Sequence, residues 1–168
     1  GRSLPGGARF LSVLADRRPR LAFVSPLPPE ASGISDYSAE LLPELARHYR
    51  IEVIVAQEQV ADAYVRANCP IRDVEWFRRH AHEFDRVLYH FGNSDFHSHM
   101  FELLRDHPGV VVLHDFFLSG IIAHRDVHGE APGTWAKALL LSHGWSAAKD
   151  RFTAKDTADV VWAFPANL

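Results

Sequence analysis

Short, wholly apolar runs are separated along this chain by longer segments in which apolar residues recur at helical spacing. Four such runs are short enough for strands, and their lack of alternation is typical of strands that are covered on both faces. The pattern therefore predicts strands at 21–25, 51–55, 86–90 and 110–114. Pro26, Pro28 and Pro29 end the first of them, because proline cannot continue a ladder.

Helical periodicity fills the intervals between these strands. Tyr37, Leu41 and Leu45 recur on one face and predict a helix over 35–48, kinked at Pro43. Further helices are predicted at 59–67, at 74–82, from a cap at Ser94 or Asp95, and at 117–124, 134–148 and 155–164. Strands that alternate with helices in this way predict an α/β fold: a doubly wound, mostly parallel Rossmann-like sheet with helices on both faces.

Length, charge and cysteine content limit the classes of protein to which this chain can belong. The chain has 168 residues, a formal charge of −3 and the single cysteine Cys69, which exclude a disulfide framework and a strongly basic nucleic-acid surface. We expect a lead-in segment at 1–19 and one domain at 20–168. The chain begins at Gly1, and its only methionine is Met100, so we expect a piece of a longer protein. Its apolar runs are far shorter than the roughly 20 residues that span a bilayer.

Polar residues follow each predicted strand, at the edge of the sheet where open α/β folds bind ligands. Gly33 stands directly before a helix start, where free N–H groups and the positive helix end suit a phosphate or diphosphate. The alternative is that Gly33 only makes the turn. Neither a dinucleotide Gly-x-Gly-x-x-Gly fingerprint nor a Walker phosphate loop is present.

Histidines end the third and fourth predicted strands. His114 and Asp115 follow the most hydrophobic run, where we favour a ligand role over a histidine that only bonds neighbouring backbone. His90, with Gly92 and Asn93, has a similar placement, and the two interpretations are about equal there.

The 11 histidines also raise a metal hypothesis. His80 and His82, like His97 and His99, are spaced i, i+2 on predicted helices, which puts the members of each pair on different faces. Solvated helix surface explains these pairs better, and we expect neither a metal site nor a cofactor.

Three segments together resemble the amino-terminal domain of bacterial family-four glycosyltransferases. They are 23–37 with 41–45, then His90-Phe91-Gly92-Asn93-Ser94, then 112–120. The resemblance implies a retaining, nucleotide-sugar-dependent enzyme whose two Rossmann-like domains face each other across a cleft, the GT-B arrangement. It also implies that the donor-gripping Glu-x7-Glu motif belongs to the other domain. We interpret the same spacing in Glu44/Glu52 and Glu75/Glu83 as chance.

The resemblance also implies roles for individual residues. His114 would contact the transferring sugar as the catalytic residue, and Gly33 would lie near the donor diphosphate. The remaining donor- or acceptor-binding residues would be Ile34, Asp36, Tyr37, His90, Gly92, Asn93 and Asp115.

The expected function is that of an acceptor-side domain, inactive alone, in a hexosyltransferase for surface polysaccharide or glycoconjugate synthesis. Its partners would be a nucleotide-sugar donor and a saccharide or lipid-linked acceptor, with no nucleic acid. We expect a cytoplasmic protein and leave open a peripheral contact with the inner face of the plasma membrane. The alternatives are a non-catalytic Rossmann-like module that binds a nucleotide or a partner and, last, a metal-dependent hydrolase.

Overall fold

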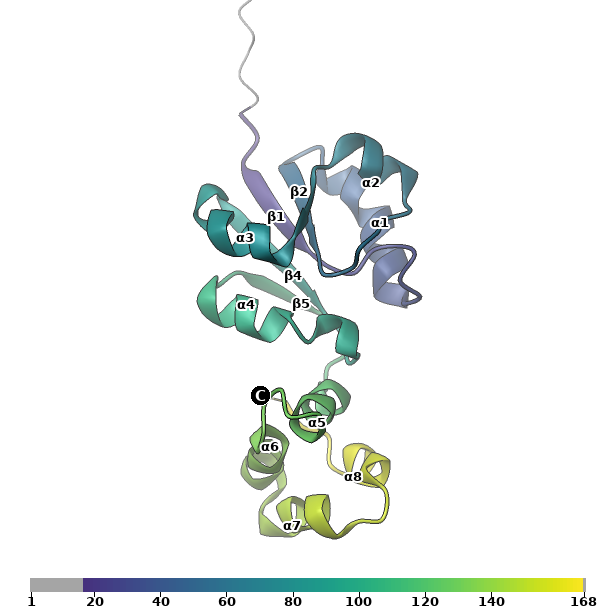
Figure 1. Cartoon of the computed structure of the whole chain (residues 1–168), viewed down its shortest axis with the longest axis vertical. Coiled ribbons are helices and arrows are strands. Elements are labelled where there is room, and N and C mark those ends of the chain that lie inside the picture. Colours follow the sequence, from purple (N-terminus) through teal and green to yellow (C-terminus); the bar gives the residue numbers. More distant parts are fainter. Residues whose placement is uncertain (1–16, 168) are drawn as a thin grey trace, which may run out of the picture.

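A computed structural model describes residues 17–167, so most of the lead-in predicted at 1–19 lies outside the described residues. These residues form a five-stranded sheet, all parallel, in the order β3-β2-β1-β4-β5 (Figure 1). The strands are β1 (Arg20–Val24), β2 (Arg50–Val55), β3 (Ile71–Asp73), β4 (Arg86–Phe91) and β5 (Val110–Leu113). The predicted doubly wound, Rossmann-like α/β fold is confirmed.

Helices connect the strands and then continue beyond them. The α-helices of the described part are α1 (Gly33–Leu45), α2 (Ala63–Asn68), α3 (Val74–His80), α4 (Met100–Asp106), α5 (Ser119–Val127), α6 (Thr134–His143), α7 (Trp145–Thr153) and α8 (Thr157–Ala163). Two 3-10 turns, η1 (Ala81–Glu83) and η2 (Asp95–His97), precede β4 and α4. Within 17–167, no helix has the length and apolar character needed to cross a membrane.

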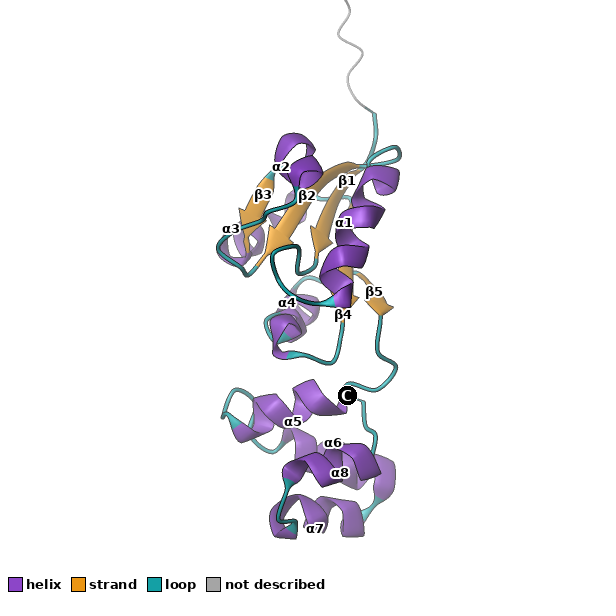
Figure 2. Ribbon diagram, turned by 90° about the vertical axis from the view of Figure 1, so that its right-hand side faces the viewer, coloured by secondary structure: helices purple, strands orange, loops and turns teal. Residues whose placement is uncertain are grey.

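Both faces of the sheet are covered, because alternate side chains of each strand point to opposite sides. Phe23 of β1 packs in one fully buried cluster with Leu42 of α1. Its neighbour Val24 joins a second cluster, which contains Phe77 of α3 and buried residues of α4 to α8. The α5–α8 group lies beyond the carboxyl ends of the strands (Figure 2).

The structure corrects two of the predicted elements and adds a strand. The helix predicted at 134–148 is two helices, because Gly144 adopts φ +83° in the left-handed region between α6 and α7. Strand β3 was not predicted, since three residues of mixed polarity carry no periodicity. β5 is an edge strand, and Val110 and Leu113 are 59% and 47% exposed. The prediction that the apolar run at 110–114 is covered on both faces was therefore wrong.

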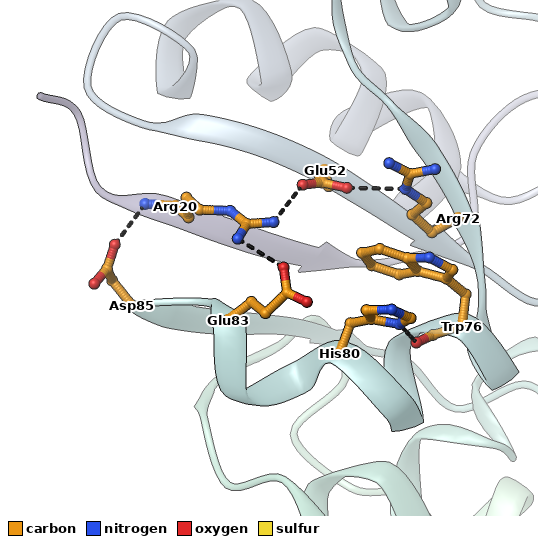
Figure 3. Close-up of polar contacts among 7 residues, drawn as sticks. All are labelled: Arg20, Glu52, Arg72, Trp76, His80, Glu83 and Asp85. Atoms are coloured by element: carbon orange, nitrogen blue, oxygen red, sulfur yellow. Dashed lines mark hydrogen bonds and ion pairs between the residues drawn. The ribbon is translucent and has the colours of Figure 1, made fainter. Parts of the chain in front are cut away.

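An ion-pair network joins β1, β2 and β3 to the turn before β4 (Figure 3). Arg20 donates to Glu52 and Glu83 at 2.9 Å each, and Arg72 donates to the other oxygen of Glu52 at 2.9 Å. The Arg72 guanidinium also lies 4.4 Å from the ring centroid of Trp76. Glu52 and Glu83, one member of each Glu-x7-Glu pair, thus both bind Arg20.

Replacing Glu52 tests the contribution of this network to stability. Burial raises the pKa of Glu52, but hydrogen bonds from Arg20 and Arg72 outweigh burial and hold the pKa below its ordinary value. We expect Glu52→Gln to lower the free energy of unfolding at pH 7 by about 2 kcal/mol, as for hydrogen bonds to a charged group. Urea denaturation of both proteins measures this difference.

The sign of the pH dependence follows from the depressed pKa. The contribution of Glu52 is fully present above the pKa of an unfolded glutamate, about 4.3, and is lost as the pH falls through the folded value. The difference between wild type and Glu52→Gln should therefore shrink in acid. Glu44→Gln removes an exposed pair with Arg47 and should change stability little. An equal loss in both variants, or one that persists at pH 3, contradicts this prediction.

Candidate functional site

A pocket of about 490 Å³ opens at the carboxyl edge of the sheet. The strand order places β1 and β4 side by side, and the chain leaves these two strands toward opposite faces. Such a switch point is where open parallel sheets bind ligands. The pocket is lined by Ser32, Gly33, Ile34, Asn93, Ser94, His114 and Asp115.

The first turn of α1 forms one wall of this pocket. Ser32 caps the helix by accepting a hydrogen bond from the Ser35 N–H at 3.1 Å. The N–H groups of Gly33 and Ile34 precede the first intrahelical bond and are the groups that a helix start offers to an anion. A Cβ added to Gly33 would meet no atom within 4 Å. The α1 N-terminus therefore borders open space.

Buried hydroxyls hold α1 against the end of β1. Ser25, directly after the strand, lies 2.7 Å from Ser38 of α1, oxygen to oxygen, and both side chains are buried. Gln57, which follows β2, accepts from the Leu27 N–H and donates to the Leu27 carbonyl oxygen. Gln57 thus supports the loop before α1 and does not line the pocket.

His114, immediately after β5, also lines the pocket. The backbone N–H of His114 donates to the backbone carbonyl of Phe91 at 2.9 Å, and this bond extends the β4–β5 ladder by one residue. Its Nε2 lies 2.9 Å from Nδ1 of His90, a β4 residue that is fully buried. The Tyr37 ring packs edge-on against His114 with 5.0 Å between centroids. The rings of His90 and Tyr37 therefore both contact His114 and fix its position.

Burial controls the charge of this histidine pair. It lowers the pKa of His90 to about 4, and the neighbouring His114 and His97 act in the same direction. It also lowers the pKa of His114, although the Asp115 carboxylate opposes the change. Because burial lowers both pKa values below the ordinary value of about 6.5, the neutral form of each ring predominates at pH 7.

Asn93 connects the pocket to the α5 helix. Its backbone N–H donates to Oδ2 of Asp115 at 2.7 Å, and its side-chain oxygen accepts from the Ile121 N–H at 3.0 Å. The amide thus caps the first turn of α5, whose own N-cap is Leu118. A Cβ on Gly120 would lie 3.0 Å from the Asn93 side-chain oxygen, so glycine permits this approach. No motif in the sequence singled out Gly120.

The interpretation of His97 as solvated helix surface was wrong. His97 is fully buried in η2, because η2 is a separate turn that packs against α5 and is not part of a continuous exposed helix. A Cβ on Gly92 would lie 2.9 Å from His97 Nε2 and would also collide with Ile34 Cδ1. Burial lowers the pKa of His97. A glycine directly after a buried strand was the available signal of this close packing.

The predicted site residues divide into three groups. Gly33, Ile34, Asn93, His114 and Asp115 line one pocket, and the structure also adds Ser32 and Ser94 to it. Tyr37 and His90 contact His114, and Gly92 is buried beneath Ile34. Asp36 is exposed on α1 and does not line the pocket. The functional roles of all these residues stay predictions.

An apolar hollow of about 680 Å³ adjoins the pocket and shares Asn93 and Asp115 with it. It lies between α5 and α8, and its lining includes Phe116, Phe117 and Trp162. Among residues 17–167, no group of three or more histidine, cysteine or acidic side chains is arranged to hold a metal ion.

Comparison with known proteins found no matching family model, no matching curated protein and no matching solved structure. The glycosyltransferase resemblance of the three segments therefore remains an expectation, and a functional proposal has to rest on the pocket and its residues.

Proposed function

We propose that this chain is the acceptor-side, Rossmann-like domain of a retaining glycosyltransferase of the GT-B type. In this proposal the enzyme transfers a hexose from a nucleotide sugar to a saccharide or lipid-linked acceptor, in the cytoplasmic steps of surface polysaccharide or glycoconjugate synthesis. A second domain of the full-length protein holds the nucleotide, and the leaving phosphate assists the displacement, so no protein nucleophile is needed in the pocket.

The observation that carries the proposal is the open glycine at the start of α1. Gly33 does not have a positive φ, and an added Cβ would meet nothing within the described residues. Neither the turn nor the packing of the chain thus requires glycine at this position. A ligand that approaches the backbone closely does require it, and a helix N-terminus favours an anionic one such as a diphosphate.

Other residues of the same pocket support binding of a sugar. His114 and Asp115 line it together with Gly33, and they can donate to and accept from hydroxyl groups. A volume of about 490 Å³ lies within the usual range of small-molecule sites, about 300–1,000 Å³. A pocket that combines anion-binding N–H groups with hydroxyl-binding side chains matches the two ends of a sugar diphosphate.

The direct test is an assay of the full-length gene product with a panel of nucleotide sugars and candidate acceptors. We expect transfer with one preferred donor and with retained anomeric configuration by NMR, and no transfer by residues 1–168 alone. Saturable nucleotide binding without transfer would favour the binding-module alternative instead. Robust transfer by the isolated chain would contradict the two-domain assignment.

Gly33→Ala separates ligand binding from stability. The added methyl group occupies open space, so we expect an unchanged free energy of unfolding but about tenfold weaker donor binding, the effect of losing about 1.4 kcal/mol of contacts. Isothermal titration calorimetry and urea denaturation measure the two quantities.

Gly144→Ala is the matched control for this variant. Gly144 has φ +83°, so alanine there costs about 1–2 kcal/mol of stability, while donor binding should not change. Wild-type affinity in Gly33→Ala would remove the helix start from the donor site.

A further inference from the structure

The hydrogen bond between His90 and His114 has a direction that the surrounding structure decides. The two nitrogens, His90 Nδ1 and His114 Nε2, are 2.9 Å apart, so one of them carries a proton that the other accepts. Both rings are neutral, and each therefore has one N–H and one bare nitrogen. Two arrangements of the protons are possible.

Burial of the remaining His90 nitrogen distinguishes these arrangements. His90 Nε2 is buried and has no hydrogen-bond partner within the described residues. If His114 were the donor, the only proton of His90 would lie on Nε2, as a buried N–H without an acceptor. If His90 donates from Nδ1, only a lone pair is left without a partner. Among backbone groups, buried N–H donors without partners are rarer than under-satisfied acceptors, and the same preference applied to the ring nitrogens favours His90 as the donor.

The state of His114 follows from the state of His90. A neutral His114 that accepts at Nε2 must carry its own proton on Nδ1. This Nδ1 is not among the buried nitrogens without partners, and the exposed part of His114 lines the pocket. His114 therefore presents a hydrogen-bond donor there, and its basic nitrogen is turned inward and occupied.

We propose that His90 is a positioning residue that locks His114 as the Nδ1–H tautomer, so that His114 donates to a ligand oxygen and does not act as a general base. The Tyr37 ring packs against both histidines, with centroids 5.0 Å from His114 and 5.9 Å from His90, and this packing restricts how the two rings can turn. The ligand atom opposite His114 is consequently an acceptor, such as a hydroxyl or phosphate oxygen of the donor. The tautomer assignment stands without the proposed function, whereas the ligand role rests on it.

Long-range ¹H–¹⁵N NMR of the histidine rings tests the tautomer without any ligand. In the wild-type chain at pH 7 we expect the protonated-nitrogen signature at Nδ1 of His114 and the bare-nitrogen signature at Nε2. His90→Leu removes the donor, so the Nδ1–H form of His114 loses the hydrogen bond that stabilises it, and the Nε2–H form, which free imidazoles favour, should gain population relative to wild type. His90→Asn places an amide donor near the former Nδ1, and it should restore the wild-type signature.

His97→Leu is the matched control, because it also removes a fully buried histidine but none that bonds to His114. It should leave the His114 tautomer unchanged. Thermal melting and near-ultraviolet circular dichroism establish that each variant is folded. Should His90→Leu fail to fold, the wild-type and His90→Asn spectra still decide the assignment. A protonated Nε2 on His114 in the wild-type chain would overturn it.

The full-length protein tests the ligand role separately. We expect His90→Leu to raise KM for the nucleotide sugar about tenfold, as for one lost hydrogen bond, and His90→Asn to recover most of the loss. An altered tautomer with unchanged KM would overturn the ligand role. If the full-length protein uses no nucleotide sugar, the proposed function fails, while the NMR result still decides the tautomer.

Discussion

His114→Ala in the full-length protein should lower kcat for sugar transfer about 100-fold, the usual cost of removing one donor that is aimed at developing charge. His114 lines the same pocket as the α1 N-terminus, where the transferring sugar lies in the proposed complex. Because we expect its Nδ1 to donate, His114→Asn keeps a donor in nearly the same place and should lose only about tenfold. Steady-state kinetics with the preferred donor measures both.

His48→Ala is the control for this experiment, because His48 is exposed and lies between α1 and β2, at the amino end of the sheet. It should retain wild-type kinetics. Kinetics of His114→Ala within twofold of wild type would remove His114 from the reaction. A large loss in both His114→Ala and His114→Asn would instead indicate that the ring, and not its donor, is required.

Trp135→Ala should cause the largest loss of stability, about 3–5 kcal/mol. Trp135 of α6 is fully buried and belongs to the cluster that joins the sheet to α5–α8. The Arg151 guanidinium lies 4.9 Å from its ring centroid and donates to Asp126 at 2.9 Å. Removing the indole leaves a cavity at this junction. Urea denaturation measures the loss, and hydrogen exchange should show that protection falls first in α5–α8.

Trp135→Phe is the matched variant. The indole Nε1 of Trp135 is buried and has no hydrogen-bond partner among residues 17–167, so a phenyl ring loses volume but no hydrogen bond seen there. We expect it to cost less than half as much as alanine. Similar losses in the two variants would mean that the indole nitrogen is bonded. A loss under about 1 kcal/mol in Trp135→Ala would mean that α5–α8 is not held through this residue.

The sheet was predictable where burial left a simple pattern. Phe23 and Val24 belong to a run without polar interruption, and that run is a central strand covered on both faces. The same pattern misled at Val110 and Leu113, because an edge strand can be apolar and still exposed. A hydrophobic run reports that a strand exists, but its place in the sheet depends on which strands lie beside it.

The candidate site was predictable only in part, for a related reason. Gly33, His90 and His114 were identified from their places at strand and helix ends, because parallel strands bring those ends together. Asn93 was expected in the pocket, and it lines it, but its side-chain oxygen caps α5 across 28 residues of sequence. The burial of His97 depends on the path of η2, which no local spacing reveals.

By itself, the sequence determined the class of fold and the edge of the sheet where chemistry can occur, since hydrophobic periodicity and strand-end polarity are local properties. The tertiary structure decided which of the polar residues meet. It paired His90 with His114 and left space beside Gly33. It used the Asn93 side chain to cap α5 and the Gln57 side chain to hold the loop at Leu27. It also brought Glu52 and Glu83 to Arg20. These relations join residues far apart in the chain, and only packing brings them within hydrogen-bond distance.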